Sequence, residues 1–424
     1  MKNFLNKFIF KSRNFDYVTI NIKRLTKSTP VNKIFKAINS SSNEAEIRYV
    51  GGCVRKIINK EKVDDIDLAT NLEPKELCEI LKKSDINFYE TGIEHGTITA
   101  AIDQYKFEIT SLREDISTDG RHAKVRFSKN WREDASRRDF TINSIYSDKD
   151  GNIFDPYDGK KDLKNGVISF IGDTNKRIKE DYLRILRYLR FFLNYSRQKH
   201  DLETLRKLRM NIGGVSKLSK ERLIQELRKI MKSDTLEKLS KDKICLDLFL
   251  MIFPELKNVD LFSKLNLEKK QILKNSDFIF LLSLMIIDET DNSEYFLYKY
   301  NVSKKDEKRI KIINNFYKNK INSKTFSETN MNKIFYYNGK QAVLDILNFR
   351  IITTKKKEKI LINLSKNYNN KLIPINPIGA QKLMNKYKIP EGKELGLKLK
   401  KIEEEWVSNN FKISDKKVEN IINN

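Results

Sequence analysis

The residues with the clearest chemical meaning lie in one stretch, Arg48 to Thr70, which reads RYVGGCVRKIINKEKVDDIDLAT. An apolar run at its start predicts the end of a strand, and the glycine pair Gly51-Gly52 follows directly. Glycines at such a point let backbone N–H groups approach a phosphate closely. Arg55, just beyond, carries a rigid fork of donors that suits phosphate oxygens. The pattern predicts a phosphate-binding turn.

Two acidic residues, Asp65 and Asp67, stand at the start of the next apolar run. Because side chains alternate across a strand, the two carboxylates share one face, while Ile66 and Leu68 point to the core. Neighbouring carboxylates repel each other unless a cation lies between them, and a divalent metal that prefers oxygen ligands is the natural occupant. Phosphate binding beside a metal site predicts nucleotidyl transfer.

Each pattern has a plainer interpretation when it stands alone. A glycine pair is most often an ordinary turn, and an Asp-x-Asp pair is most often a loop or a helix cap. The catalytic interpretation therefore depends on the order of the two patterns and on the motifs that come later in the chain.

Length, composition and charge narrow the class of protein. The chain has 424 residues, enough for about two to four compact units. It has no run of about 18 uncharged apolar residues, so we expect no membrane span. The cysteines Cys53, Cys78 and Cys245 are too widely spaced for a disulfide framework or a zinc site, which favours a reduced protein of the cytoplasm.

The net charge of +26 is concentrated at the ends of the chain. Residues 1–30 carry seven basic and one acidic side chain, and residues 301–424 carry 27 basic and 12 acidic ones, which leaves only +5 for the middle. Basic ends favour a polyanionic partner that extends beyond the active site. The alternative is a general drift of composition towards Lys, Asn and Ile. We expect residues 1–30 to be a frayed basic extension rather than a transit peptide, because Ser and Ala are scarce.

The elements that would position the acidic residues follow from the hydrophobic pattern. We expect a helix over 31–47, the strand that ends at Thr70, and a strand over 105–110 in which Glu108 faces away from the core. If these two strands are neighbours, Glu108 supplies a third carboxylate to the metal site. Otherwise it is a solvated strand residue.

Two further segments are rich in arginine. Residues 111–136 lack a core-forming period, which predicts a mobile loop, and a helix is expected to begin at Arg137-Arg138. Arginines at a helix N-terminus oppose the helix dipole, so an anionic ligand nearby would account for them.

The segment from residue 180 to 192 predicts an amphipathic helix with Asp181, Arg184 and Arg187 in one file, although a solvated basic face is an equally good interpretation. A second helix over 219–231 would carry Glu226 on its polar face. From about residue 235 onward we expect only helices, the last of them over 395–407.

With these motifs assembled, the chain resembles the family of class II tRNA nucleotidyltransferases, or CCA-adding enzymes, and bacterial poly(A) polymerases. The matching segments are GGCVR at 51–55, DIDLAT at 65–70, RRDFTIN at 137–143, EDYLRILRYLR at 180–190 and SKERLIQEL at 219–227. Several motifs in the right order are a more specific signal than any one of them. The family often has Asp where this chain has Lys56, a change that bears on the orientation of Arg55.

The resemblance implies an α+β fold. A polymerase-beta-like nucleotidyltransferase head with a mixed or antiparallel sheet would occupy residues 31–172. It would be followed by a helical neck over 173–235 and a helical body and tail over 236–424. The neck would bind the nucleotide base and RNA, and the body and tail would bind the acceptor stem and elbow of tRNA through phosphate and shape contacts. The protein would be a monomer or a homodimer.

The resemblance also implies roles for individual residues. Asp65 and Asp67 would bind two Mg²⁺ ions, with Glu108 as the third catalytic carboxylate. One ion would activate the 3′-hydroxyl of the RNA, and the other would stabilise the leaving pyrophosphate.

The nucleotide itself would be bound by seven residues: Gly52, Arg55, Arg138, Asp181, Arg184, Arg187 and Arg190. The first three would hold the triphosphate. Asp181 and Arg184 would read the Watson–Crick edge of the base in place of a template, and the last two would complete the site.

The expected activity is addition of CCA to the 3′ end of tRNA from CTP and ATP. TGIEHGTIT at 91–99 is similar to CCA-adding members, whereas poly(A) polymerases tend to carry a basic segment there. The alternatives are a poly(A) polymerase or an A-adding enzyme of the same fold, and, from a different class, a catalytically weak RNA-binding protein. The complete set of acidic and basic motif residues argues against the last.

Overall fold

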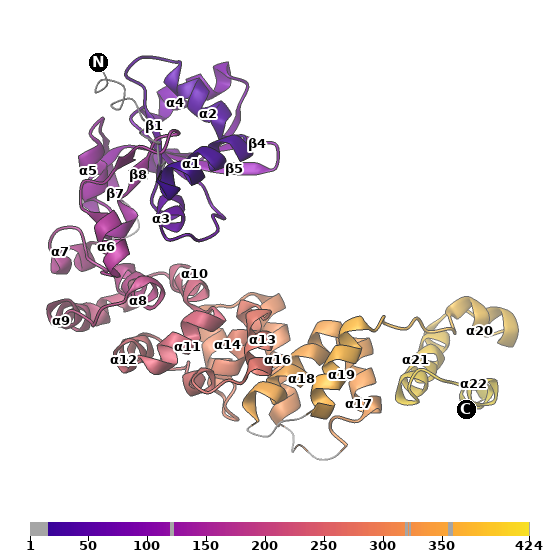
Figure 1. Cartoon of the computed structure of the whole chain (residues 1–424). Helices are drawn as coiled ribbons and strands as arrows, with labels where there is room; N and C mark the ends of the chain where they lie inside the picture. Colours follow the sequence, from indigo (N-terminus) through magenta and orange to yellow (C-terminus); the bar gives the residue numbers. More distant parts are fainter. Residues whose placement is uncertain (1–15, 119–122, 319–320, 322–323, 355–358, 424) are drawn as a thin grey trace, which may run out of the picture. The chain divides into compact units, whose positions relative to one another are not determined.

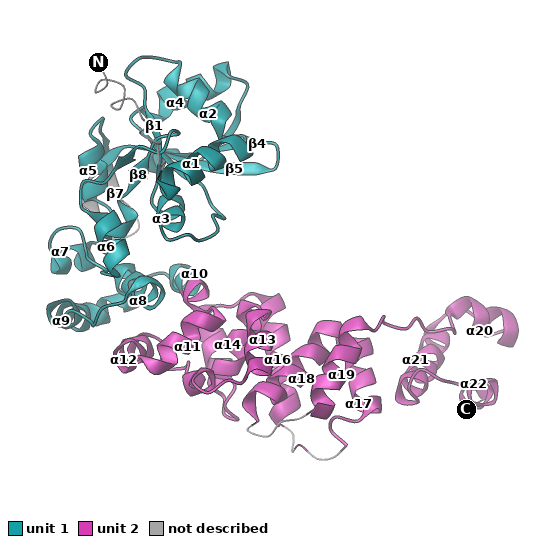
Figure 2. Ribbon diagram, in the orientation of Figure 1, with its two compact units in different colours: residues 1–226 teal, residues 227–424 magenta. Residues whose placement is uncertain are grey.

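The computed structural model describes residues 16–423 apart from 119–122, 319–320, 322–323 and 355–358 (Figure 1). The chain divides into unit 1, residues 1–226, and unit 2, residues 227–424 (Figure 2). The division falls inside the segment 173–235 that the sequence suggested as a neck. Unit 1 carries the sheet, and unit 2 is helical throughout its described residues.

A mixed sheet organises unit 1. Over the described residues it has seven strands in the order β3-β4-β5-β2-β1-β8-β9. Their bounds are β1 Ile47–Val50, β2 Asp67–Thr70, β3 Asn87–Gly92, β4 Thr97–Ile102, β5 Tyr105–Ser111, β8 Tyr146–Ser147 and β9 Ile153–Phe154. β2 and β5 pair in parallel, with Asp67 opposite Glu108, so the expected neighbourhood of these two strands is confirmed.

Four helices pack on this sheet: α1 Tyr17–Ser28, α2 Val31–Asn39, α3 Gly52–Ile58 and α4 Pro74–Lys83. Val18 and Ile22 of α1 are buried in the same core as α2 and the sheet. Residues 17–28 are therefore part of the head rather than a frayed extension, because α1 has an apolar face. Residues 1–15 lie outside the described part. Helix α2 is shorter than expected and ends at Asn39, where Ser42 turns the chain by accepting a hydrogen bond from the Ala45 N–H at 3.1 Å.

The segment 111–136 is structured, and the prediction of a featureless loop was wrong. It forms a hairpin of β6 Arg113–Thr118 and β7 Ala123–Phe127, followed by α5 Trp131–Ser136. Asn130 caps α5 by accepting from the Arg132 N–H at 2.9 Å, and Trp131 and Ala135 are buried. The hairpin strands are only five or six residues long and pair with each other alone, so they leave no core-forming period in the sequence. Residues 119–122 lie outside the described part of the chain.

The remaining helices of unit 1 and its boundary are α6 Gly159–Asn165, α7 Thr174–Glu180, α8 Leu183–Tyr195, α9 Leu202–Asn211 and α10 Lys220–Ile230. The helix expected over 180–192 is broken between α7 and α8. Asp181 has an extended backbone there, and its carboxylate accepts from the Leu183 N–H at 3.1 Å. A short acidic side chain that competes for backbone N–H groups favours such a helix start.

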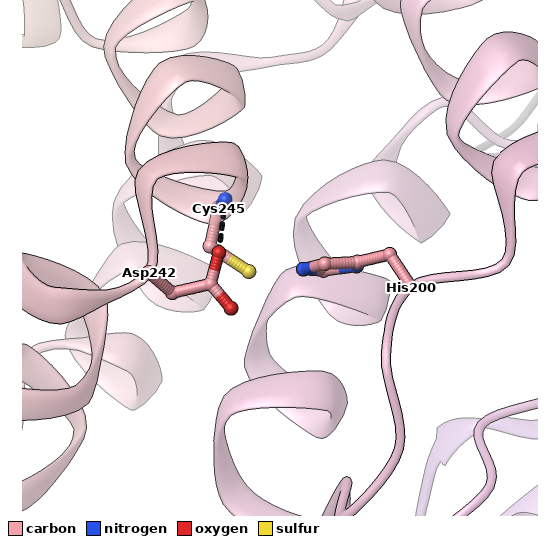
Figure 3. A group of neighbouring side chains, drawn as sticks. All are labelled: His200, Asp242 and Cys245. Carbon is pink, nitrogen blue, oxygen red and sulfur yellow. Dashed lines mark hydrogen bonds between the residues drawn. The ribbon is translucent and has the colours of Figure 1, made fainter.

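Unit 2 contains only helices among its described residues, as predicted. They are α11 Ser233–Lys241, α12 Lys243–Ile252, α13 Leu267–Lys274, α14 Phe278–Ile286, α15 Asn292–Tyr300, α16 Lys304–Lys318, α17 Glu328–Asn338, α18 Lys340–Thr353, α19 Lys359–Asn370, α20 Ala380–Tyr387, α21 Lys393–Ser408 and α22 Asp415–Asn423. Asp242 caps α12 by accepting from the Cys245 N–H at 2.9 Å (Figure 3). The helix expected over 395–407 is α21, and α22 follows it. No described helix meets the length and apolarity that a membrane span requires.

Candidate active site

Three carboxylates meet at the parallel strand pair of the sheet. Asp67 begins β2, Glu108 faces it from β5, and Asp65 lies two residues before β2. All three line a cavity of about 740 Å³. Glu108 projects from the side of β5 opposite the buried Phe107 and Ile109, as the strand alternation predicts. The sheet therefore brings together the acidic residues that the sequence singled out.

The electrostatics of this cavity favour a cation. Burial raises the pKa of Asp67, and the negative charges of Glu108 and Asp65 raise it further, against the opposing effects of Arg138 and Arg55. Among the described residues that line the cavity, the groups that could bind a metal are carboxylates, with no histidine or cysteine. Such an all-oxygen set fits Mg²⁺.

The glycine turn lies directly beside these acids. Gly51 has a φ of +64°, a conformation that side chains disfavour, and its N–H donates to the Ile145 carbonyl at 3.1 Å. A Cβ added to Gly52 would lie 3.6 Å from the Asp67 carboxylate, and one added to Gly51 would lie 3.6 Å from the Arg138 guanidinium. The two ends of the stretch Arg48 to Thr70 thus converge on one place, open to a ligand because both glycines lack side chains.

Arg55 is buried near this turn, with 6% of its surface exposed. It donates to the Asn143 side-chain oxygen, and its guanidinium lies 4.8 Å from the centre of the Phe191 ring. Lys56 pairs with Asp64 instead. The departure at position 56 therefore leaves Arg55 with its own partner, because Asn143 orients the guanidinium.

Arg137 and Arg138 follow the C-terminus of α5, so the helix expected to begin there was a wrong prediction. The negative end of the helix dipole favours cations at this position. Asp134, 1% exposed, binds both, at 2.6 Å from Arg137 and 3.0 Å from Arg138. Burial alone would raise the pKa of Asp134, but the two guanidiniums and the Tyr146 hydroxyl outweigh it and hold this pKa well below its usual range.

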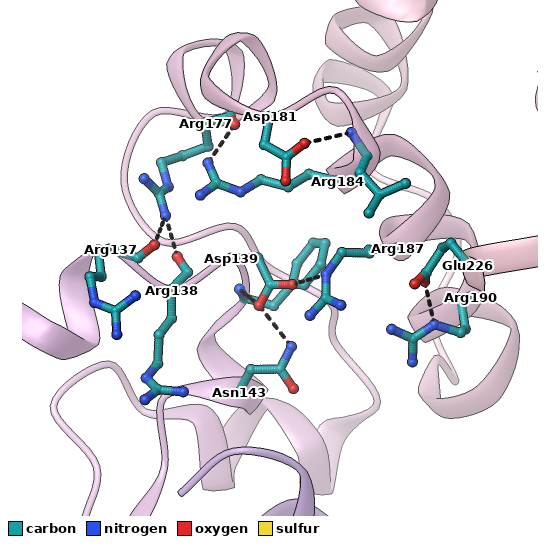
Figure 4. Close-up of polar contacts among 12 residues, drawn as sticks. Arg137, Arg138, Asp139, Asn143, Arg177, Asp181, Arg184, Arg187, Arg190 and Glu226 are labelled. Carbon is teal, nitrogen blue, oxygen red and sulfur yellow. Dashed lines mark hydrogen bonds and ion pairs between the residues drawn. The ribbon is translucent and has the colours of Figure 1, made fainter. Parts of the chain in front are cut away.

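A second buried network joins helix α8 to the turn (Figure 4). Asp139 accepts from Arg187 at 2.6 Å and from the Asn143 amide at 2.8 Å. Asn143 also accepts from Arg55, so the chain of contacts runs from Arg187 to Arg55, near the glycine turn. Sequence analysis gave no role to Asp134, Asp139 or Asn143. The spacing of Asp134 to the two arginines, three and four residues, was the available signal.

The expected base-reading residues, Asp181 and Arg184, are close neighbours but bind different partners (Figure 4). Arg184 donates to Glu180 at 2.8 Å, and the Asp181 carboxylate accepts from Arg222 at 2.8 Å. Their link to each other is the hydrogen bond from the Arg184 N–H to the Asp181 carbonyl, at 3.0 Å. The prediction that Asp181, Arg184 and Arg187 lie in one file along a single helix is therefore wrong, since Asp181 precedes α8.

Arg190 donates to Glu226 and lies 4.1 Å from the centre of the Phe191 ring. Glu226 is 2% exposed, so the prediction that it lies on a polar face was wrong. Its carboxylate is buried because Arg190 neutralises it.

Comparison with known proteins defines the class of the fold. Residues 47–169 match the family model described as the poly A polymerase head domain. The CCA-adding enzyme of Staphylococcus haemolyticus is 31% identical over 320 residues, which are 74% of this chain and 75% of that protein. The chain belongs to the family of CCA-adding enzymes.

Other relatives cover a shorter part. The mitochondrial CCA tRNA nucleotidyltransferase 1 of Homo sapiens is 46% identical over 189 residues, 44% of either chain, and that of Danio rerio is 42% identical over 192 residues. The chain spans 44% of the length of these two proteins.

Solved structures establish the fold over almost the whole chain. The CCA-adding enzyme of Bacillus stearothermophilus in complex with CTP has a TM-score of 0.65 at 20% identity and covers 90% of this chain and 93% of that one. The Thermotoga maritima enzyme complexed with tRNA has a TM-score of 0.55 at 17% identity and covers 96% of this chain and 98% of that one. The predicted α+β nucleotidyltransferase fold with helical C-terminal parts is thus confirmed.

Proposed function

We propose that this chain adds CCA to the 3′ end of tRNA from CTP and ATP, without a nucleic-acid template. The observation that carries the proposal is the group of Asp65, Asp67 and Glu108 beside a glycine turn, the buried Arg55 and the half-buried Arg138. The names of the relatives support CCA addition as the product. Complexes of related enzymes with CTP, ATP and tRNA support the substrates.

The three carboxylates would hold Mg²⁺. Bound there, Mg²⁺ would lower the pKa of the RNA 3′-hydroxyl and neutralise charge on the leaving pyrophosphate. The backbone at Gly52 would lie against the triphosphate, and Arg138 and Arg55 would donate to its oxygens. Asp134 and Asn143 hold these two guanidiniums in place, so little conformational freedom is lost when the nucleotide binds.

Asp181 and Arg184 would read the base. A carboxylate accepts from the exocyclic amino group that C and A share, and a guanidinium donates to their ring nitrogen, whereas U and G offer the opposite pattern. Asp181 can accept beyond its bond to Arg222, because each carboxylate oxygen has two acceptor sites. We expect Asp181→Ala to weaken selection of C and A against U and G more than it weakens RNA binding. Unchanged selectivity would remove Asp181 from the base-reading role.

A gel assay with tRNA that lacks its 3′ terminus tests the proposed function. With Mg²⁺ and labelled CTP and ATP, separately and together, we expect two C additions and then one A, with no further growth. Long A tracts on any RNA would assign poly(A) polymerase activity, the second candidate, which the name of the matching head-domain model favours. A single A added only to tRNA that ends in CC would indicate an A-adding enzyme. No incorporation would favour an RNA-binding protein.

We also propose that the protein acts in the cytoplasm, because its three cysteines, all among the described residues, form no disulfide. A fusion of residues 1–30 to a fluorescent reporter tests the alternative. Import of the reporter into an organelle would contradict the cytoplasmic assignment.

A further inference from the structure

Unit 2 contains a groove that the proposed reaction does not use. It lies among helices α13, α14, α16, α18 and α19, which contact one another within this unit. Its volume is about 400 Å³. That lies within the range of roughly 300 to 1,000 Å³ typical of small-ligand sites.

An ion pair lies at one side of the groove. Asp345, 2% exposed, binds Arg309 through both oxygens, at 2.6 and 2.9 Å, and also accepts from Gln341 at 2.8 Å. Arg309 also pairs with Asp277. The guanidinium is thus committed to two carboxylates and offers no spare positive charge. A buried ion pair rarely stabilises a fold more than apolar packing does, so stability alone does not account for this cluster. Its side chains are held in fixed positions and can present a polar surface to a ligand.

Carboxamides supply most of the other polar lining, from Asn275, Gln341, Asn348 and Asn369. Each carboxamide offers two donors and one acceptor oxygen. Within the described part of the chain, the side chains of Asn275 and Asn369 make no hydrogen bond, and Asn348 uses only its oxygen, with Ser365 at 3.1 Å. These groups are therefore available to a neutral ligand with mixed donors and acceptors.

Two further features of the lining narrow the chemical class of the ligand. Phe280, Ile272 and Leu344 add apolar surface to the lining, and Lys366 is an exposed cation that lines the same groove. Asp277 and Asp345 repel an anion that lies against them, and Arg309, which pairs with both, offsets part of their attraction for a cation, so the phosphate of a ligand would lie near Lys366 instead. A planar base with one phosphate satisfies all of these groups.

We propose that this groove binds a nucleotide, with the base edge on the carboxamides and the phosphate near Lys366. The nucleotide comes either from a bound RNA strand, in which case the inference depends on the proposed function, or from free nucleoside phosphates. A base held in this way gives the body of the protein a hydrogen-bonding contact with RNA in addition to contacts with phosphates.

The test uses two double variants on helix α19. The groove variant is Lys366→Ala with Asn369→Ala, whose side chains are exposed. The control is Lys359→Ala with Asn370→Ala, which removes the same groups from exposed positions outside the groove. The measurements are equilibrium binding of tRNA that lacks its 3′ end, calorimetric titration with AMP and CMP, and cross-linking of 4-thiouridine-substituted tRNA followed by peptide mapping.

If RNA supplies the nucleotide, the groove variant binds tRNA about tenfold more weakly than the control, and cross-links map to α18 or α19 in the wild type. If free nucleotides bind, the titration shows a second site that only the groove variant loses. Equal tRNA affinity in both variants, no cross-link at these helices and no second site would overturn the proposal. If the wild type neither binds nor extends tRNA, the proposed function fails. The AMP titration then still decides whether the groove binds a nucleotide.

Discussion

At the scale of single residues, the site depends on buried charges that hold other charges in place. Asp134 binds Arg137 and Arg138, and Asp139 binds Arg187. These aspartates are almost fully buried, so each would be costly without its arginine partner. Asp134 holds Arg138 beside the glycine turn, whereas Asp65 and Glu108 remain exposed on the wall of the cavity.

Removal of the exposed Asp65 carboxylate should lower the rate of catalysis without disturbing the fold. We expect Asp65→Ala to lower the rate of nucleotide transfer at least about a thousandfold, because the proposed metal site would lose a ligand, while tRNA affinity stays nearly unchanged. Asp64→Ala is the matched control, since Asp64 lines the same cavity but pairs with Lys56. Single-turnover extension and filter binding measure the two quantities, and full activity of Asp65→Ala would refute the metal assignment.

Asp139 should make stability depend on pH. Burial raises its pKa, but Arg187 and Asn143 outweigh burial and hold the pKa below the usual 3.8. A depressed pKa contributes stability that is present above the unfolded-state value and is lost as pH falls through the folded-state value. We expect Asp139→Asn to lose about 3 kcal/mol of unfolding free energy at pH 6.

The difference from the wild type should shrink as pH falls from 6 to 3. Urea unfolding at several pH values measures it. A gap that stays constant with pH would show that the charge of Asp139 is not the cause.

At the scale of elements, the break between α7 and α8 sets the positions of the residues proposed to bind the nucleotide base. The 3₁₀ helix η4, Ile212–Lys217, lies against this break, and Gly214 approaches the ring of Tyr182 directly. Tyr182 stands between Asp181 and the start of α8. The position of the expected base-reading residues therefore depends on a glycine about 30 residues later in the chain.

We expect Gly214→Ala to lower selectivity for C and A and to destabilise the protein by about 1–3 kcal/mol, because the new Cβ would overlap the Tyr182 ring. Gly213→Ala is the control, since a Cβ there meets nothing within 4 Å. Misincorporation of UTP and GTP, together with thermal unfolding, reports both effects. If the two variants behave alike, η4 does not position the site.

At the scale of the whole molecule, the excess of positive charge in the C-terminal part suits a partner larger than a nucleotide. Residues 301–424 carry 27 basic and 12 acidic side chains, well away in sequence from the catalytic strands. Helices α20 to α22 share a small apolar core that includes Leu383, Ile402 and Val418, which leaves their lysines at the surface. Such a surface suits the phosphates of RNA.

We expect Lys382→Ala combined with Lys401→Ala to weaken tRNA binding several-fold. The slope of log K against log salt should fall by about one for each phosphate that the variant no longer neutralises. The KM for ATP should not change, because both lysines lie in the tail. Titrations between 50 and 200 mM salt measure the slope. An unchanged slope would remove these lysines from the RNA interface.

Local pattern was sufficient for much of the protein. The alternation around Glu108, the glycine pair before Arg55 and the helical periods after residue 235 each depend on neighbours in the sequence, so strand β5, the turn and the all-helical second half were predicted correctly. The order of the motifs was sufficient to identify the family. Elements without a strong period were missed, namely the hairpin in 111–136 and helix α5.

The sequence by itself determined which residue types the site contains and the class of fold. Only the tertiary structure decided which residues bind each other: Asp134 with Arg137 and Arg138, Asp139 with Arg187, and Arg222 with Asp181. Burial gives these pairs their strength, and burial depends on how distant segments pack. Charged residues that look solvated in a sequence, such as Glu226, become buried because a partner 36 positions away supplies the opposite charge.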